Sequence, residues 1–352
     1  SAASDVYKRQ RRDFTVNAMA YNAEYGLVDP YGGKNDLKDK IIRCVGNPDT
    51  RFNEDALRIL RALRFASVYG FSIEVNTSKS IFKNADLLKN IATERVISEF
   101  LKLICGKDAV KILDAYRETI AVIIPEITVM FNFNQNNIHH SYDLWQHTLI
   151  ALGTIEPNPI LRMTMLLHDI GKPSVKTTDN SGQSHFQGHQ LESKKIADRI
   201  LHRLRLPSDF INKTLLLIEY HDVRFNGSKK LMKKVMNVLG TDLTKQLLEV
   251  EYADISAQSE YQREEKLGYL STAKTHLNEI IKDNECFKLS QLDINGKDVL
   301  NLGVKEGRDV GNILDYLLML VVDANVPNKK SILISKAKEY IYGCLLYTSD
   351  AA

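Results

Sequence analysis

The stretch from Phe52 to Phe65 constrains the fold of this chain more than any other. Asn53 has a side chain suited to cap the start of a helix, and the acidic Glu54 and Asp55 follow it in what would be the first turn. Apolar residues then recur at steps of three and four: Ala56, Ile59, Leu60, Leu63 and Ala66. This spacing places them on one face, so the stretch predicts a helix that begins at Asn53 and buries that face.

The other side of the expected helix carries Asp55 and Arg58, which are surface neighbours at a spacing of three, and Arg61 and Arg64 extend the basic stripe. A carboxylate only accepts hydrogen bonds and a guanidinium only donates them. The pair therefore matches the pairing edge of cytosine or adenine and mismatches that of uracil or guanine. The alternative is an ordinary surface ion pair, which contributes roughly a few tenths of a kcal/mol.

Composition narrows the class of protein. The chain has 352 residues, 44% hydrophobic and 26% charged, as expected for two or three packed domains. No apolar run approaches the roughly 20 residues of a membrane span. Four cysteines without paired spacing favour a reduced, cytoplasmic setting. The net charge is only +3, so any nucleic-acid site must be a local basic patch.

A second group of candidate residues lies between His139 and Asp254. The sequence places His147 first, then the pair His168-Asp169 after the apolar run 163–167, and finally Asp254. Imidazole and carboxylate together suit a divalent transition metal. The alternative for each histidine is a hydrogen-bonded core residue. Three further histidines lack such a context and are expected at the surface: His139, His140 and His202.

The order of several short motifs resembles a known family. They are Arg11-Arg12-Asp13-Phe14-Thr15-Val16-Asn17-Ala18, Asp29-Pro30-Tyr31-Gly32-Gly33, Asp36-Leu37, the Glu54–Phe65 helix, Glu94-Arg95-Val96-Ile97 and Glu99-Phe100. In this spacing the chain resembles the class II CCA-adding tRNA nucleotidyltransferases and the related bacterial poly(A) polymerases, over nearly its whole length. The resemblance implies that Arg11, Arg12 and Asp13 contact ribose and triphosphate. It implies that Asp55 and Arg58 read the incoming base, and it extends nucleotide binding to Asn17 and Arg61.

The histidine and aspartate pattern resembles the HD phosphohydrolase superfamily. That resemblance maps metal ligands onto four positions: His147, His168, Asp169 and Asp254. His189 and His221 fall where extra metal or phosphate contacts occur in the superfamily.

Together the resemblances imply a mostly α fold, in which the remnant of an α/β nucleotidyltransferase palm precedes a helical neck, a helical HD domain and a helical tail. The expected boundaries are a non-native leader at 1–10, palm remnant 11–47, neck 48–125, HD domain 126–265, tail 266–343 and a non-native end at 344–352. A lysine cluster on one helix face is expected to be solvated or to contact tRNA: Lys229, Lys230, Lys233 and Lys234.

The implied function is the addition of C and A, from CTP and ATP, to tRNA 3′ ends, with Mg²⁺ as the catalytic metal. In this family, the two aspartates of an Asp-x-Asp strand bind the catalytic Mg²⁺. No residues upstream of Arg11 supply such a pair. We therefore expect a fragment without its catalytic carboxylates that does not transfer nucleotides. The alternatives are an HD-type metal-dependent phosphohydrolase, a poly(A) polymerase and a non-catalytic tRNA-binding fragment. The sequence leaves the oligomeric state open.

Overall fold

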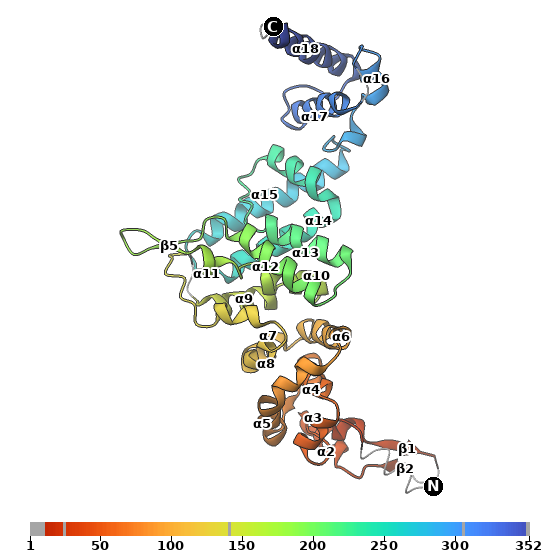
Figure 1. Cartoon of the computed structure of the whole chain (residues 1–352), viewed down its shortest axis with the longest axis vertical. Helices are drawn as coiled ribbons and strands as arrows, with labels where there is room; N and C mark the ends of the chain where they lie inside the picture. Colours follow the sequence, from red (N-terminus) through yellow and green to blue (C-terminus); the bar gives the residue numbers. More distant parts are fainter. Residues whose placement is uncertain (1–10, 24–25, 140–141, 305–306, 350–352) are drawn as a thin grey trace. The chain divides into compact units, whose positions relative to one another are not determined.

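The computed structural model describes residues 11–23, 26–139, 142–304 and 307–349, and most of them are helical (Figure 1). The expected leader at 1–10 and the last three residues of the expected non-native end lie outside the described residues. The chain divides into two compact units. The first comprises the chain up to Asp222 together with Glu249–Arg263, and the second comprises Val223–Leu248 and Glu264 onward. No helix in the described part is long and apolar enough to cross a bilayer.

The first unit begins with a small mixed region of short elements. In chain order these are η1 (Thr15–Asn17), β1 (Ala20–Asn22), β2 (Gly26–Val28), α2 (Gly33–Asp39) and β3 (Ile41–Ile42). The strands β1 and β2 form an antiparallel hairpin, and β3 pairs in parallel with β4 (Ser72–Ile73). A single 3₁₀ turn follows Phe14, and the chain enters β1 at Ala20. Asp29 accepts hydrogen bonds from the first amides of α2 and so stabilises its start.

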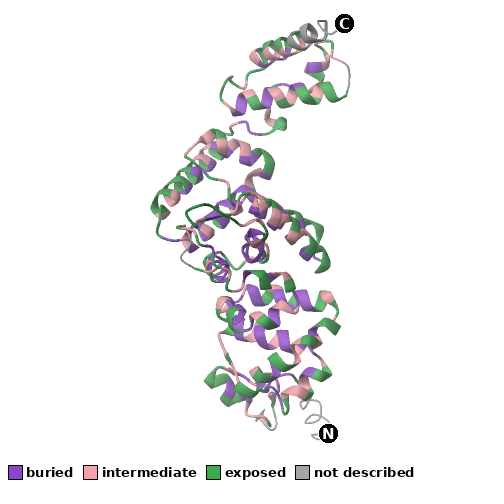
Figure 2. Cartoon of the chain, turned by 60° about the vertical axis from the view of Figure 1, so that its left-hand side comes forward, coloured by how far each residue is buried: buried purple, intermediate pink, exposed green. Residues whose placement is uncertain are grey.

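A helical region follows from Pro48 to Met130. Its elements are α3 (Pro48–Glu54), α4 (Leu57–Tyr69), α5 (Val75–Asn84), η2 (Ala85–Asn90), α6 (Thr93–Ile104), α7 (Ala109–Ala115), α8 (Arg117–Ala121) and η3 (Pro125–Met130). The apolar face expected on α4 is fully buried at Ile59, Leu60 and Leu63, and α4 packs against α6. In Figure 2, buried residues run along one side of these helices and exposed residues along the other. Gly70 ends α4 with a φ of 69°, a conformation that glycine adopts without strain.

The expected helix start at Asn53 is wrong. Asn53 lies inside α3, which begins at Pro48 and is capped by the side chain of Asn47. The chain becomes extended at Asp55, with φ −153° and ψ 101°, before α4 begins. The Asp55 carboxylate then accepts a hydrogen bond from the amide of Leu57 at 3.1 Å. Asp55 rather than Asn53 therefore stabilises the start of the apolar helix.

A second group of helices completes the first unit. It comprises α9 (Leu144–Thr154), α10 (Pro159–Leu167), α11 (Lys172–Val175), β5 (Thr177–Thr178), β6 (Ser184–His185), α12 (His189–Arg203), α13 (Ser208–Tyr220) and the later part of α14 (Lys229–Ala257). Asp143 caps α9, because its side chain accepts a hydrogen bond from the amide of Gln146. The helix α10 packs against α9 and α13, and its residues 161–167 are all buried.

The second unit contains the first part of α14, most of α15 (Arg263–Lys282), η4 (Leu289–Gln291), α16 (Gly296–Leu300), α17 (Arg308–Val322) and α18 (Lys330–Ser349). Non-helical backbone at Gly240 divides α14 into two helical parts. The three last helices enclose a core that includes Val299, Leu317 and Leu333.

Each lysine of the cluster on α14 pairs with an acidic side chain. Lys229 and Lys233 pair with Glu285, at 2.5 and 2.7 Å. The other two members, Lys230 and Lys234, both pair with Asp323, at 3.0 and 3.2 Å. The cluster therefore ties α14 to the segment after α15 and to the end of α17. These ion pairs could not be predicted from neighbouring residues in the sequence, because the acidic partners lie far along the chain from the lysines.

Candidate functional site

The residues expected to read a base lie at the junction of α3 and α4. Asp55 is one-third exposed, and its second oxygen accepts a hydrogen bond from Arg95 of α6 at 3.0 Å. Arg58 is more buried, with 15% of its side chain exposed. Its guanidinium donates to Glu54 at 2.9 Å and to the carbonyl of Arg11 at 2.8 Å. Asp55 and Arg58 therefore pair with other residues. This arrangement differs from the surface ion pair between Asp55 and Arg58 that is the alternative to base reading.

A pocket of about 400 Å³ opens beside Asp55. Its walls include the apolar side chains of Leu87 and Ile91 and the charged side chains of Asp55 and Arg95. Apolar walls with a few convergent polar groups are typical of small-molecule sites. Arg58 is not among the lining residues, so a ligand in this pocket would meet Asp55 and Arg95 first. Arg95 belongs to one of the motifs that carry the family resemblance, but its contact with Asp55 could not be predicted, because the two residues lie 40 positions apart.

The other residues expected to bind nucleotide differ in exposure. Arg11 and Arg12 are exposed at the start of the described chain. Asp13 is buried, and its carboxylate accepts hydrogen bonds from Asn17 at 3.1 Å and from Arg61 at 2.8 Å. Asp13, Asn17 and Arg61 thus form one network that holds the chain before η1 against α4, whereas the two arginines keep free surface.

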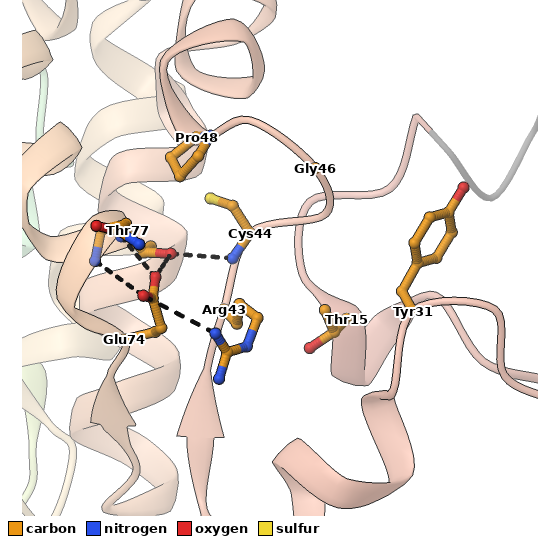
Figure 3. Close-up of a pocket in the computed structure, with 9 residues that line it drawn as sticks. Thr15, Tyr31, Arg43, Cys44, Gly46, Pro48, Glu74 and Thr77 are labelled. Atoms are coloured by element: carbon orange, nitrogen blue, oxygen red, sulfur yellow. Dashed lines mark hydrogen bonds and ion pairs between the residues drawn. The ribbon is translucent and has the colours of Figure 1, made fainter.

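A second pocket, of about 220 Å³, lies between β3 and α5 (Figure 3). Its charged groups already have partners within the pocket. Arg43 pairs with Glu74, and Glu74 accepts hydrogen bonds from the backbone and side chain of Thr77. Burial raises the pKa of the Cys44 thiol to about 12, so this cysteine is no nucleophile at neutral pH. We assign no function to this pocket.

The second group of candidate residues, the histidines and aspartates between His139 and Asp254, comes together in the interior of the first unit. His147 comes from α9, His168 and Asp169 follow the end of α10, and Asp254 comes from α14. One side-chain atom from each lies within 4.8 Å of all the others. The closest contacts to His147 Nε2 are an oxygen of Asp254 at 2.9 Å and one of Asp169 at 3.4 Å. The structure thus brings all four predicted ligands together.

Asp169 also faces a second group, formed with His189 and His221. Its Oδ2 points to the first group, whereas its Oδ1 lies 3.3 Å from His189 Nε2 and 3.5 Å from His221 Nε2. Ligand atoms of these three residues again lie within 4.8 Å of one another. One carboxylate therefore links two candidate cation sites, which we call the first site (His147, His168, Asp169, Asp254) and the second site (Asp169, His189, His221).

Each of the four histidines is oriented by a contact of its Nδ1 atom. The Nδ1 atoms contact backbone carbonyls, at 3.3 Å for His147, 2.7 Å for His168, 2.9 Å for His189 and 2.6 Å for His221. A carbonyl only accepts, so each Nδ1 carries the proton of that hydrogen bond. The four Nε2 atoms are consequently turned toward the aspartates. This is the arrangement by which proteins fix histidines as metal ligands.

The polar atoms between these residues are incompletely satisfied. Among the described residues, His168 Nε2 and Asp169 Oδ1 are buried and have no hydrogen-bond partner. Burial alone would lower the pKa of His168, but the nearby carboxylates of Asp169 and Asp254 raise it to about 10. Burial alone would raise the pKa of Asp169, yet His168 and Lys172 hold it well below its ordinary range. The raised pKa values of His147 and His168 show that these carboxylates favour a positive charge between them, and a cation fits there.

Two buried residues beside the first site were not expected. Lys172 donates to Asp169 Oδ2 at 2.6 Å and to Gln135 at 3.2 Å, and all three side chains are buried. Glu251 lies one helical turn before Asp254, and its Oε1 has no hydrogen-bond partner among the described residues. The Gly171-Lys172 continuation of the motif was a signal for Lys172, whereas nothing in the sequence pointed to Glu251.

The surface histidines are only partly as expected. His202 is exposed and pairs with Asp198 at 3.1 Å. His139 is half-buried, and its ring packs edge-on against Tyr261 with centroids 5.0 Å apart. His140 lies outside the described residues.

Three family models match the chain. They are described as a poly A polymerase head domain, over residues 3–43, a probable RNA and SrmB-binding site of polymerase A, over 70–131, and a putative tRNA nucleotidyltransferase domain 2, over 189–337. The matches follow one another along the chain. They include Arg11 to Asn17, Arg95, and the three candidate ligands His189, His221 and Asp254, whereas the residues 44–69 and 132–188 lie outside the matched ranges.

Relatives and a solved structure agree with these matches. A CCA-adding enzyme of Ligilactobacillus salivarius is 28% identical over 94% of this chain and 71% of its own length. A multifunctional CCA protein of Legionella pneumophila is 32% identical over 64% of this chain, which spans only 58% of that relative. The crystal structure of the Bacillus stearothermophilus CCA-adding enzyme in complex with CTP has a TM-score of 0.66 at 24% identity, covering 96% of this chain and 75% of that one. This last likeness shows a shared fold.

Proposed function

Because the chain belongs to the class II CCA-adding enzyme family, we propose that it serves in adding C and A residues, from CTP and ATP, to the 3′ ends of tRNA. The observation that carries this proposal is the ordered match of head-domain, RNA-binding and second-domain models to one chain. The exposed carboxylate of Asp55 beside a pocket supports it. The proposal includes a cytoplasmic location, which the unpaired spacing of the cysteines supports.

In this proposal Asp55 accepts a hydrogen bond from the exocyclic amine of C or A, and Arg58 donates to the neighbouring ring nitrogen. Arg11 and Arg12 are exposed and suited to triphosphate oxygens. Asp13, Asn17 and Arg61 act by holding this segment against α4. The chain contains no Asp-x-Asp pair, so its residues do not fit the Mg²⁺ pair of nucleotidyl transfer, and we derive no step through that metal.

Equilibrium dialysis with labelled nucleotides tests the base-reading part on the chain as it exists. We expect CTP and ATP to bind more tightly than UTP and GTP, and Asp55→Asn to remove most of that preference. Asp86→Asn is a matched control, because Asp86 is an exposed aspartate of the same region that pairs with Lys89. Equal binding of all four nucleotides by the unaltered chain would overturn the assignment of Asp55 and Arg58.

A poly(A) polymerase remains the alternative within this family. It predicts a preference for ATP alone. Equal affinity for CTP and ATP in the same dialysis experiment contradicts that alternative.

We propose, as a second function, that the first and second sites bind divalent transition-metal ions and support phosphoester hydrolysis. Four histidines with their Nε2 atoms turned toward two carboxylates carry this proposal. When bound, such a metal supplies Lewis-acid polarisation of a phosphoester and acidifies water. The chain's own residues orient the ligands, and Lys172 places a buried positive charge beside Asp169.

Metal content tests this second function. Protein stripped with EDTA, loaded with Co²⁺ and desalted should hold two ions per chain by elemental analysis. The double variant His168→Ala/Asp169→Ala should hold none while keeping its helical circular dichroism. His202→Ala, which changes an exposed histidine, should still hold two. Unchanged metal in the double variant contradicts the site. Adenosine 2′,3′-cyclic phosphate left uncleaved by the Co²⁺-loaded protein contradicts the hydrolytic part.

A further inference from the structure

Gly171 brings the backbone of the His168-Asp169 turn into direct contact with α12. A β-carbon at Gly171 would lie 2.5 Å from the amide nitrogen of Ser193 and 2.8 Å from the carbonyl oxygen of His189. Its φ of −82° is open to any residue, so backbone conformation does not require glycine here. What requires glycine is the close approach of the two backbones.

Ser193 completes this contact with a hydrogen bond. Its hydroxyl accepts from the amide of Gly171 at 2.9 Å, and the serine is fully buried. Ser193 lies four residues after His189, on the same face of α12. The contact therefore joins the segment that carries Asp169 to the helix turn that carries His189.

We infer that Gly171 and Ser193 are positioning residues for the second site. They set the separation of Asp169 Oδ1 from His189 Nε2, which is 3.3 Å in this structure. Asp169 is shared, but the other ligands of the first site come from α9, from the residue after α10 and from α14 rather than from α12, so we expect the first ion to be affected less. The inference rests on the two-ion proposal above, and it assigns to Gly171 and Ser193 a role mainly in binding the second ion.

The experiment compares Gly171→Ala and Ser193→Ala with the unaltered chain. Isothermal titration with Co²⁺ after EDTA treatment gives the dissociation constant of each ion, and elemental analysis gives the number retained. Removing a partner that orients a metal ligand typically costs tenfold to a hundredfold in affinity, roughly, so the second ion should weaken by that factor. The first ion should be affected less, and His189→Ala should give the same pattern.

Controls separate this role from a general effect on folding. Gly268→Ala is the matched glycine control, because a β-carbon at Gly268 meets nothing within 4 Å. Ser193→Thr keeps the hydroxyl and should bind the second ion more tightly than Ser193→Ala. If Gly171→Ala does not fold, the serine variants decide alone.

Two results would overturn the inference in different ways. If the unaltered chain binds two ions and Ser193→Ala binds both with unchanged constants, the positioning role is wrong and the two-ion proposal stands. If the unaltered chain binds fewer than two ions, the two-ion proposal fails and the inference fails with it.

Discussion

The proposed base-reading role of Asp55 predicts a defined change in nucleotide selectivity for Asp55→Asn. In the structure, one carboxylate oxygen of Asp55 accepts from the amide of Leu57 and the other from Arg95. Asparagine keeps an acceptor for the Leu57 amide, so α4 keeps its stabilised start. It replaces the other oxygen by an amino group, which donates to the O4 carbonyl of uracil and repels the amine of cytosine.

The magnitude follows from the two contacts that compete for this oxygen. The pair with Arg95 is solvent-exposed, with 53% of the arginine and 34% of the aspartate side chain accessible, so breaking it costs at most about 1 kcal/mol. A charge-assisted hydrogen bond to the amine of the base contributes about 1.5–3 kcal/mol. Asp55 can therefore leave Arg95 for a base. Its loss should lower the preference for CTP over UTP by roughly tenfold to a hundredfold.

The assay is the ratio of kcat/KM for CTP and UTP in an enzyme that supplies the Asp-x-Asp strand to this chain. Asp86→Asn should leave the ratio unchanged. Arg95→Ala should strengthen CTP binding by no more than about fivefold, because it removes a competitor worth at most about 1 kcal/mol. If Asp55→Asn lowers the overall rate and leaves the ratio unchanged, Asp55 only caps α4 and pairs with Arg95, and the base-reading argument is wrong.

Three further predictions concern the rest of the chain. The chain as given, incubated with tRNA, CTP, ATP and Mg²⁺, should not lengthen the tRNA 3′ end, and an extended product on a sequencing gel refutes this. Burial, with the charges of Asp254 and Asp222, raises the pKa of Glu251 well above its ordinary value, so the metal-free protein loses stability as pH rises from that ordinary value through the raised pKa. Glu251→Gln should therefore raise Tm by roughly 5 °C at pH 8 and have little effect near pH 4.5, and an equal effect at both pH values contradicts the assignment. Lys233→Ala breaks a largely buried ion pair with Glu285, so it should lower Tm while changing tRNA affinity less than twofold. A larger loss of tRNA affinity with an unchanged Tm would instead support a contact between Lys233 and RNA.

Much of the fold was predictable because its signals are local. The apolar spacing on α4 depends on residues within a few positions of one another, and the structure confirms the buried face that it predicts. The error at Asn53 was also local in origin: three good capping residues, Asn47, Asn53 and Asp55, occur within nine positions. Propensity does not choose among them. The choice depends on α3 packing against α5 before the chain turns into α4.

The sequence alone determined which side chains are available for chemistry: the aspartate and arginine of the α3–α4 junction, and the histidines and aspartates of the two candidate cation sites. Only the tertiary structure decided how they are used. Asp55 meets Arg95 across 40 residues, and one Asp169 carboxylate is shared between two groups of ligands. The physical reason is that hydrogen bonds and ion pairs act over a few ångströms, and the distances between remote residues are set only when the helices pack.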